Sequence, residues 1–561
     1  MNRICILTLT AWCVLAAPPG ETVLKIGGGE GWSFLNGTWS DGPDGALVPP
    51  DGGGIEYMAV WNQAEYADFR ASCRFQFRAA NGGARLLFRV KDSARYYALD
   101  VPWSGQQNRN RHMWAGIVLA DGTPLQRYLS FAMVPGVAPE RNRWYQARLE
   151  ASGPRLRAWI EGRLIADVRD PTYRSGRLGL MGLITAGANS PHFAQFNISA
   201  TSVRPSAWSG LAAPPPHWIT PCKETDPGAH QTYPNLIRGN SGALAVSIPF
   251  GNPSQGETRR TVWVRSNDHG RSWSAPEPAA LTQGFGGSFV RRDGTWVAVH
   301  ANPGFKGPAG QALFTFESKD EGKTWSGPKP FRTISGWPAE LELPFYISGQ
   351  PVRLRDGALL VSVYAERVNT PTHPATHETT PGAASNFVFR STDDGVTWAP
   401  PVRCDRNNPE NPKHPDRWFS PANFTEIGLA EAEDNVVVGL GRPGPWPFMW
   451  QLRSADGGRT WDPAAFAPFP GYCISLTRMA GGALVAVTRF PYLAAHVSYD
   501  GGRNWDHGTI LDTPIWANHK AVEVEPNVLL ILYMGHMVRK GQADDRILRL
   551  KVTDKGLEVA R

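Results

Sequence analysis

The chain has 561 residues, of which 19% are charged, and a formal net charge of +7. Its length allows about four domains, and a mild charge without a long Lys/Arg block permits an acidic ligand but gives little reason to expect a nucleic-acid partner. The 59 glycines and 48 prolines supply many turns, yet together they stay below the share of roughly 25–30% that marks disorder. We therefore expect a packed protein that is rich in β-strands.

The first residues have the pattern of a signal peptide. Arg3 precedes an apolar stretch over residues 4–15, which is followed by the small residues Ala16 and Ala17. A positive residue, a short apolar run and a small-residue end are typical of a secretory signal, and the run is too short for a membrane-spanning helix. We predict that residues 1–16 are removed and that the mature protein is secreted or periplasmic, without contact to the membrane.

Four cysteines remain after this cleavage: Cys73, Cys222, Cys404 and Cys473. Their wide spacing fits no metal-binding pattern. In an oxidising compartment, both a disulfide and four buried thiols are possible. We expect neither a metal ion nor a cofactor.

Residues 17–204 have the pattern of an antiparallel β-sandwich. Apolar and polar residues alternate over residues 69–77, 84–90 and 144–149, as in strands with one buried face, and no amphipathic helix pattern interrupts them. In this pattern of short strands the region resembles the concanavalin-like, laminin-G-like jelly rolls that are often joined to carbohydrate enzymes. The proline-rich residues 205–221 that follow are predicted to form a linker.

The remaining chain contains a sequence repeat. The pattern S-x-D-x-G-x-x-W occurs five times, beginning at Ser266, Ser318, Ser391, Ser454 and Ser498. A short Asp side chain can accept backbone N–H bonds in a tight turn, Gly allows a positive φ, and Trp fills space between neighbouring sheets. Five copies indicate a repeated structural unit.

A second repeat alternates with the first. It consists of two apolar stretches joined by a turn, and its six copies are centred near residues 240–241, 293–294, 356–357, 434, 481 and 526. Six such hairpins and five Asp-containing turns predict six four-stranded blades of a closed propeller over residues 222–561. In the sixth blade we expect the third strand at residues 546–552 and the outer strand from the segment near residues 207–221.

Asp boxes on a six-bladed propeller resemble the sialidase (neuraminidase) superfamily. The resemblance covers residues 222–561 and implies a protein that acts on glycans. Asp boxes also occur in non-catalytic propellers and in other glycan enzymes, since they specify a fold better than an activity.

The hairpin geometry predicts where a site lies. Each inner hairpin turns on one face of the propeller, so the free strand ends meet on the opposite face, near the axis. Residues equidistant from a turn centre are cross-strand neighbours, which places Glu426 beside Arg442 and Tyr346 beside Arg367, and brings Arg489 to the same funnel. Converging guanidinium groups can hold a carboxylate, and a Glu can act as a base or orient an Arg.

Further polar residues fall at the ends of the first and sixth hairpins. Tyr233 and Asn235 come before the first, and Asn518 and His519 before the sixth. Trp446 follows the fourth hairpin, where it can stack on a sugar ring. We expect these five side chains to contact the substrate.

The resemblance to sialidases implies particular residues in this funnel. The family carries a Glu before one inner strand and an Arg after the next, a pattern that Glu426 and Arg442 match, and Arg489 matches a later family Arg. At the place of the first family Arg stands Tyr233, and at the place of the nucleophilic Tyr stands Asn518. We therefore expect chemistry other than the family's tyrosyl-enzyme mechanism.

Other groups can replace the missing nucleophile. Tyr346 next to Arg367 would be a phenol beside a cation, which favours the phenolate. His519 can serve as a base in a lyase-like or inverting reaction.

Taken together, the sequence predicts an exported all-β protein with a jelly-roll sandwich followed by a six-bladed propeller. We expect a sialidase-like glycoside hydrolase that acts on a glycan with a sialic or uronic acid, and no nucleic-acid partner. A non-catalytic glycan-binding propeller and a polysaccharide lyase are the alternatives. The expected catalytic residues are Glu426, Arg442, Arg489, Tyr346 and Arg367. The expected substrate-binding residues are Tyr233, Asn235, Trp446, Asn518 and His519.

Overall fold

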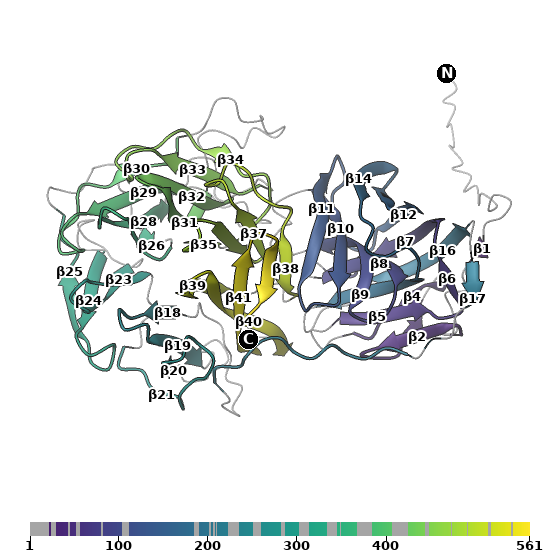
Figure 1. Cartoon of the computed structure of the whole chain (residues 1–561), viewed down its shortest axis with the longest axis horizontal. Helices are drawn as coiled ribbons and strands as arrows, with labels where there is room; N and C mark the ends of the chain where they lie inside the picture. The colour runs from purple at the N-terminus through teal and green to yellow at the C-terminus, as the bar shows by residue number, and fades with distance from the viewer. Residues whose placement is uncertain are drawn as a thin grey trace, which may run out of the picture.

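The computed structural model describes residues 22–560 with interruptions. It leaves out residues 24–29, 43–44, 52–55, 80–81, 104–111, 185–189, 201–202, 206–207, 209, 223–234, 251–259, 282–286, 302–312, 334–344, 348, 367–383, 407–423, 444–447, 473, 491, 514–517 and 540–541. The predicted signal peptide lies outside the described residues. All elements from β1 to β42 are strands (Figure 1), which confirms the all-β fold class. Within this part of the chain, no helical segment has the length and apolarity that crossing a membrane requires.

The N-terminal part forms two antiparallel sheets. The first has the order β14 (Arg163–Arg169), β13 (Arg155–Ile160), β12 (Trp144–Ser152), β7 (Phe69–Gln76), β16 (His192–Ala200), β4 (Leu47–Val48) and β3 (Ser40–Asp41), with β1 (Thr22–Val23) beside β16. The second begins with β2 (Trp32–Leu35), β5 (Glu56–Trp61), β15 (Arg177–Ile184), β8 (Gly82–Val90), β9 (Arg95–Trp103), β10 (Met113–Asp121) and β11 (Gln126–Val134). Outside both sheets, β17 (Val203–Pro205) pairs with β6 (Ala64–Tyr66).

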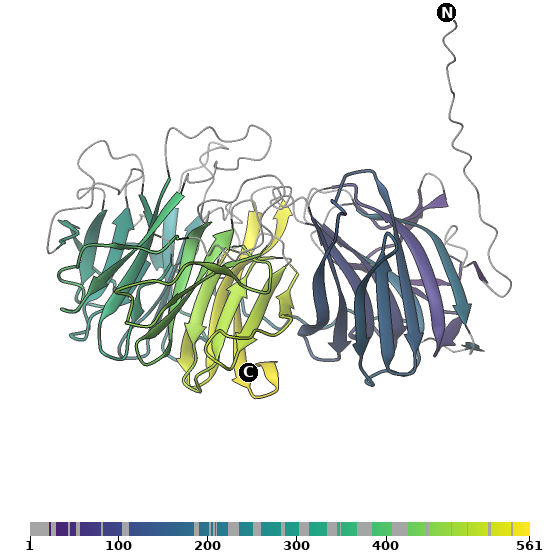
Figure 2. The same cartoon turned by 90° about the horizontal axis from the view of Figure 1, so that it is seen from above.

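These two sheets pack face to face around one hydrophobic core (Figure 2). Phe75, Tyr145 and Phe193 enter it from the first sheet, Leu86 and Leu99 from the second, and all five are fully buried. Successive side chains of a strand point to opposite faces, so the alternation in the sequence becomes one buried and one outward face. The two layers agree with the predicted sandwich, whereas its jelly-roll connectivity stays a prediction.

The C-terminal part is built from antiparallel units set around a common axis (Figure 1). Five of them are separate sheets. The first is β18 (Asn235–Arg238), β19 (Leu244–Phe250), β20 (Arg260–Ser266) and β21 (Glu277–Pro278), and the second is β22 (Gly287–Val290), β23 (Trp296–Ala301), β24 (Leu313–Ser318) and β25 (Ser326–Pro330). The third is β26 (Phe345–Ile347) and β27 (Val352–Arg353), both beside β28 (Leu359–Glu366), then β29 (Ala384–Ser391) and β30 (Val402–Arg403). The fourth is β31 (Phe424–Glu433), β32 (Val436–Pro443), β33 (Trp450–Ser454) and β34 (Ala465–Phe466), and the last is β39 (His519–Glu525), β40 (Val528–Arg539), β41 (Gln542–Thr553) and β42 (Gly556–Val559).

The prediction of six separate blades is therefore wrong, because five blades stand alone. The strands β35 (Ile474–Arg478), β36 (Leu484–Thr488), β37 (Leu493–Ser498) and β38 (Thr509–Asp512) also form a four-stranded unit. This unit, however, belongs to the second N-terminal sheet, which it extends to eleven strands through the pair β11–β38. The sequence repeat predicts the four strands of this unit, but it does not predict that β38 pairs with β11 of the N-terminal part.

The Asp boxes have the structural role that the sequence predicts. In the third copy the Ser391 hydroxyl donates to Asp393 at 2.8 Å and accepts the Gly395 N–H at 2.9 Å. The Thr397 N–H donates to Asp393 at 2.9 Å and closes the turn. The other four copies repeat these bonds. Each box thus satisfies its own polar groups.

The last blade differs from the prediction in one strand. Its third strand, β41, contains the predicted residues 546–552. Its outer strand is β42, from the C-terminal end of the chain, and not the segment near residues 207–221. Ile219 of that segment forms only an isolated bridge with Ile547. The tight turn from Thr553 to Gly556 places β42 directly beside β41. The edge of β41 is therefore paired without the segment near residues 207–221.

A buried polar cluster joins the two parts of the protein. Arg85 on β8 donates to Asp100 on β9 at 2.8 Å, and neither side chain has any exposed surface. Tyr128 on β11 donates to the other oxygen of Asp100 at 2.5 Å, and Tyr492, from the propeller, donates to Asp100 at 2.9 Å. Apolar side chains from both parts surround this cluster, including Ile510 of β38. The interface is therefore packed like a protein core.

The segment predicted as a linker takes part in this interface. Trp208 and Leu211 pack against the same apolar cluster. The guanidinium carbon of Arg177 lies 4.2 Å from the centroid of the Trp208 ring. The described residues of this segment thus fix the two parts to each other.

We expect the substitution Asp100→Ala to destabilise the whole chain. It leaves the charge of Arg85 buried without a carboxylate, which typically costs about 3–5 kcal/mol. Urea unfolding should show the loss in both parts at once. The matched control is Asp167→Ala, which removes a surface partner of Arg155 and should change the free energy of unfolding little. Equal effects of the two variants would contradict the role of the buried pair.

The Asp-box carboxylates make stability depend on pH. Hydrogen bonds from the side chain and the backbone of Thr324 lower the pKa of Asp320 from 3.8 to about 2. Bonds from the backbone and side chain of Asn504 lower the pKa of Asp500 to about 2. A carboxylate with a lowered folded-state pKa stabilises fully above its unfolded pKa, and this contribution is lost as the pH falls through the folded value. We expect the free energy of unfolding in urea to fall between about pH 4 and pH 2, and less steeply in Asp320→Asn and Asp500→Asn.

Candidate functional site

The predicted pair at the end of the fourth inner hairpin is present. Arg442 Nη1 donates to Glu426 Oε1 at 2.6 Å. The two side chains are 16% and 15% exposed, so the pair is accessible from solvent but mostly enclosed. The register differs by one residue from the prediction, because Arg442 is paired with Thr425. Glu426 is the extra residue of a β-bulge between Thr425 and Ile427.

The backbone of Glu426 is strained. Its φ is +48°, in the left-handed region that residues with a side chain rarely adopt. A bulge of this kind re-aims one side chain, and such positions are frequent beside functional sites. The second carboxylate oxygen, Oε2, is buried and has no hydrogen-bond partner among the described atoms. Glu426 is thus held at an energetic cost with one oxygen left for a further contact.

Tyr472 connects the arginines of two neighbouring units. The guanidinium carbon of Arg442 lies 4.9 Å from the centroid of the Tyr472 ring, a cation–π contact that fixes the plane of the guanidinium group. The Tyr472 carbonyl accepts the backbone N–H of Arg489 at 3.0 Å. Tyr472 was not predicted as a site residue. Tyr472 comes just before the inner strand β35, at the free end of its hairpin. The hairpin symmetry that places Glu426 and Arg489 at free strand ends could therefore also have identified Tyr472.

Arg489 and Asn518 meet as neighbours of this cluster. The pairing of Ile474 with Thr488 confirms the hairpin centre at residue 481 that places Arg489 at the strand end. Its guanidinium group donates to Asn518 Oδ1. The amide holds the guanidinium group without neutralising it, because it carries no charge.

His519 has a structural contact. It is 2% exposed, and its Nε2 lies 2.8 Å from the Val487 carbonyl oxygen. The pairing of His519 with Tyr533 confirms the hairpin centre at residue 526. The contact ties β39 to β36, so this ring is part of the propeller wall. Its predicted role toward a substrate stays a prediction.

The third hairpin does not have the predicted register. Tyr346 is opposite Tyr364, and their rings stack with centroids 4.9 Å apart. The prediction that Tyr346 lies opposite Arg367 is therefore wrong by three positions. The reason is an irregular segment between β26 and β27, which adds residues to one side of the hairpin.

Asn235 begins β18 opposite Ser247 and is 7% exposed. Arg367, Tyr233 and Trp446 lie outside the described residues. The structure thus pairs Glu426 with Arg442 and Arg489 with Asn518, and Tyr472 contacts both arginines.

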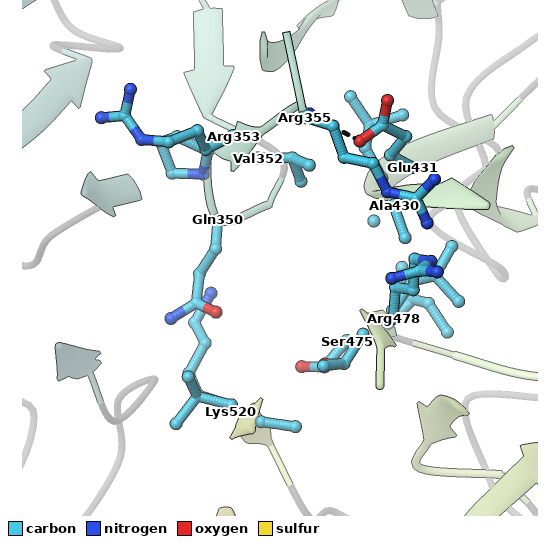
Figure 3. A pocket seen from close by; sticks show the side chains of 17 residues that line it. Gln350, Val352, Arg353, Arg355, Ala430, Glu431, Ser475, Arg478 and Lys520 are labelled. Carbon is cyan, nitrogen blue, oxygen red and sulfur yellow. Dashed lines mark hydrogen bonds between the residues drawn. The ribbon is translucent and has the colours of Figure 1, made fainter. Parts of the chain in front are cut away.

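A cavity of about 330 Å³ lies on the propeller axis (Figure 3). Residues of four inner hairpins line it, among them Arg355, Glu431, Arg478 and Lys520. Glu431 accepts the backbone N–H groups of Arg355 at 2.7 Å and of Asn435 at 3.1 Å. Arg355, Glu431 and Arg478 lie toward the hairpin turns, whereas Lys520 follows His519 near the free end of its hairpin. The lining residues do not include Glu426 or Arg442.

Two further observations concern metals and thiols. In the described ranges, no group of three His, Cys, Asp or Glu side chains is placed to hold a metal ion. Cys73 and Cys404 are buried free thiols, and Cys222 is a half-buried one. Burial raises the pKa of the Cys73 and Cys404 thiols. Both stay protonated and unreactive at neutral pH.

Two domain families match parts of the chain. The model of the BNR repeat-like domain matches residues 286–515. This BNR repeat-like region contains four of the five Asp boxes and the cluster around Glu426. The model of the 3-keto-alpha-glucoside-1,2-lyase-like domain matches residues 27–190. That range covers most of the first two sheets.

Solved structures with a related arrangement have low sequence identity. A protein of unknown function from Dyadobacter fermentans is 20% identical over 61% of this chain and 98% of its own, with a TM-score of 0.45. The NanB sialidase from Streptococcus pneumoniae is 12% identical over 86% of this chain and 95% of its own, with a TM-score of 0.44. A carbohydrate binding module from Bacillus subtilis is 20% identical over 30% of this chain and 96% of its own, with a TM-score of 0.24. The comparison with curated proteins gives no match. These values assign no function to the chain.

The strain at Glu426 can be measured. We expect Glu426→Gly to be more stable than Glu426→Ala by about 1 kcal/mol, because glycine adopts a positive φ without steric cost. Both variants lose the ion pair with Arg442, so the difference reports the backbone. Urea unfolding of the two variants gives this value directly. Equal stabilities would mean that the bulge relaxes once the carboxylate is gone.

Proposed function

We propose that this protein is a glycoside hydrolase that acts on a glycan containing an acidic sugar. Arg442 and Arg489 bind the sugar carboxylate, and Glu426 is the catalytic carboxylate. The observation that carries the proposal is the Glu426–Arg442 pair, held in a strained bulge and still reached by solvent. A structural ion pair would not need this backbone conformation, which costs of order 1–3 kcal/mol.

The guanidinium groups of the two arginines are held in place before any anion binds. Arg442 is held by Glu426 at one edge and by the Tyr472 ring below it, which leaves little conformational entropy to lose on binding. Guanidinium groups bind carboxylates through paired hydrogen bonds. The backbone N–H of Arg489 is bonded to the Tyr472 carbonyl, and in this proposal the Arg489 guanidinium group shares the sugar carboxylate with Arg442. In this proposal the two guanidinium groups bind the carboxylate of an acidic sugar, and the carboxylate of Glu426 acts on its glycosidic bond.

The reaction we propose is the addition of water across the glycosidic bond. The bond between the anomeric carbon and the bridging oxygen breaks, water supplies the new hydroxyl, and a proton goes to the leaving oxygen. The unpartnered Oε2 of Glu426 can take or give that proton. The Asp boxes support a glycan substrate through their resemblance to the sialidase superfamily.

A lyase is the second candidate. The match of residues 27–190 to a domain named for a glucoside lyase favours it. In a lyase, a base removes a proton beside the carboxylate and the leaving oxygen departs with its bonding electrons, so no water is consumed. The arginines would then neutralise the carboxylate and acidify the neighbouring C–H group.

Mass spectrometry of the products tests these proposals. The mature protein, from Ala17 onward, is incubated with sialylated glycans and with uronic-acid glycans in parallel. A monosaccharide with one water added supports the hydrolase and identifies the sugar. An unsaturated uronic product, lighter by one water, supports the lyase. Binding without any product supports a non-catalytic glycan-binding propeller and contradicts both.

Substitution of Glu426 tests its role. Glu426→Gln keeps the shape of the side chain and should lower turnover by about 10²–10⁴-fold, the usual contribution of a general acid or base. The matched control is Glu433→Gln on the same strand, where the carboxylate binds Arg503 at 2.7 Å near the hairpin turn. The control should keep wild-type turnover. Arg442→Lys should raise KM, since an ammonium group cannot form the paired bonds. Full turnover of Glu426→Gln would exclude the proposed role.

A further inference from the structure

The outward face of the first sheet carries a dense group of arginines. It is formed by β7, β12, β13 and β14, which are consecutive neighbours in the sheet; β7, β12 and β14 are labelled in Figure 1. We call this surface the arginine face. Its charged residues are Arg70, Arg74, Arg148, Arg155, Arg157, Arg169, Glu150 and Asp167. Six cations and two carboxylates leave a net charge of +4 on one sheet face, out of +7 for the chain.

Tryptophan rings hold three of these arginines. The guanidinium carbon of Arg148 lies 3.9 Å from the centroid of Trp159, and that of Arg157 lies 5.4 Å from the same ring. Arg74 lies 5.2 Å from the centroid of Trp144. Cation–π stacking fixes the planes of these groups along the sheet. The face is therefore ordered and not a set of freely moving side chains.

The carboxylates on the face do not balance its charge. Glu150 is shared between Arg70, at 3.4 Å, and Arg157. Among the described side chains, Arg74 and Arg148 form no ion pair. A guanidinium group without a carboxylate can bind an external anion without first breaking an internal pair. Arg74 and Arg148 are two groups placed for this.

Two further arginines oppose each other across strands. Arg155 on β13 is directly paired with Arg169 on β14. Like charges in this position are destabilising. The carboxylate of Asp167 lies 2.5 Å from the guanidinium group of Arg155, and this single negative charge offsets only part of the positive charge of the two arginines. An anion bound between the two arginines relieves the repulsion.

The position of the face leaves it accessible. The opposite side of the first sheet forms the core between the two sheets, and the second sheet makes the contact with the propeller. Arg70, Arg148 and Arg155 are exposed. The strands β7, β12 and β13 pair in continuous register, so the outward side chains of the three strands form rows across the sheet. The arginine face therefore suits an extended ligand better than a small enclosed one.

We propose that the arginine face binds an acidic polysaccharide through its carboxylate or sulfate groups. The aromatic rings decide against single-stranded nucleic acid. Proteins bind such strands by stacking bases on open aromatic rings, whereas here Arg148 and Arg157 lie over Trp159, and Arg74 lies over Trp144. The groups presented outward are guanidinium groups, which recognise oxyanions. This binding does not depend on the proposed reaction in the propeller.

The test is the affinity of the full mature chain for polygalacturonate and for dextran sulfate, measured by calorimetry at several salt concentrations. The two polymers separate carboxylate from sulfate recognition, and neutral dextran serves as the blank. We expect the double variant Arg74→Gln/Arg148→Gln to bind the preferred polymer at least tenfold more weakly. The matched control, Arg355→Gln/Arg503→Gln, removes two exposed propeller arginines and the same charge. It should keep the wild-type affinity, and thermal unfolding checks that both variants fold.

Three results would overturn the proposal. Equal losses in the two double variants would mean that only net charge matters. Tighter binding of single-stranded DNA than of both polymers, lost in Arg74→Gln/Arg148→Gln, would identify a nucleic-acid surface instead. Loss of polymer binding in Glu426→Gln/Arg442→Lys, with the arginine-face variant unaffected, would place the binding in the propeller. Unchanged binding in that propeller variant supports the arginine face whatever the outcome of the product analysis.

Discussion

The buried ion pair between Arg85 and Asp100 makes the two parts of this protein one structure. Tyr492 from the propeller completes the hydrogen bonds of Asp100, so the charge is satisfied only when the parts are joined. Each part also has an edge strand with unpaired backbone groups, a liability that proteins usually cover. The pairing of Gln126 and Arg127 of β11 with Ile510 and Thr509 of β38 covers part of both edges at once. Independent motion of the two parts would expose charge and backbone together.

This joint also supports the candidate site. Trp114 of β10 belongs to a buried cluster with Tyr472 and Phe490 of the propeller. The ring of Tyr472 in turn lies against the guanidinium group of Arg442. Packing thus extends from the N-terminal sheets to the ion pair with Glu426. The N-terminal part shapes the candidate site in addition to any ligand that it binds itself.

The regular features of this chain were predictable from sequence because they are local and repeated. Each Asp box satisfies its hydrogen bonds within a few residues, and the hairpins centred at residues 481 and 526 are symmetric, so simple counting gave their pairing. The third hairpin failed because an irregular segment between β26 and β27 moved Tyr346 opposite Tyr364. The bulge at Glu426 and the pair β11–β38 were also missed. Neither a backbone kink nor a contact between distant edges leaves a periodic signal.

The same contrast explains why the fold was easier to predict than the activity. The Asp boxes use their side chains to close turns, and the bonds they make are the same in each copy, so they indicate the fold but do not identify a particular sugar or reaction. Specific chemistry requires a departure from that regularity. Glu426 is such a departure, with a positive φ, a bulged register and one buried oxygen that has no hydrogen-bond partner among the described residues. The inner strands of a propeller repeat a backbone, but the residues at their free ends do not repeat, and it is there that Glu426 binds Arg442 and that Asn518 binds Arg489.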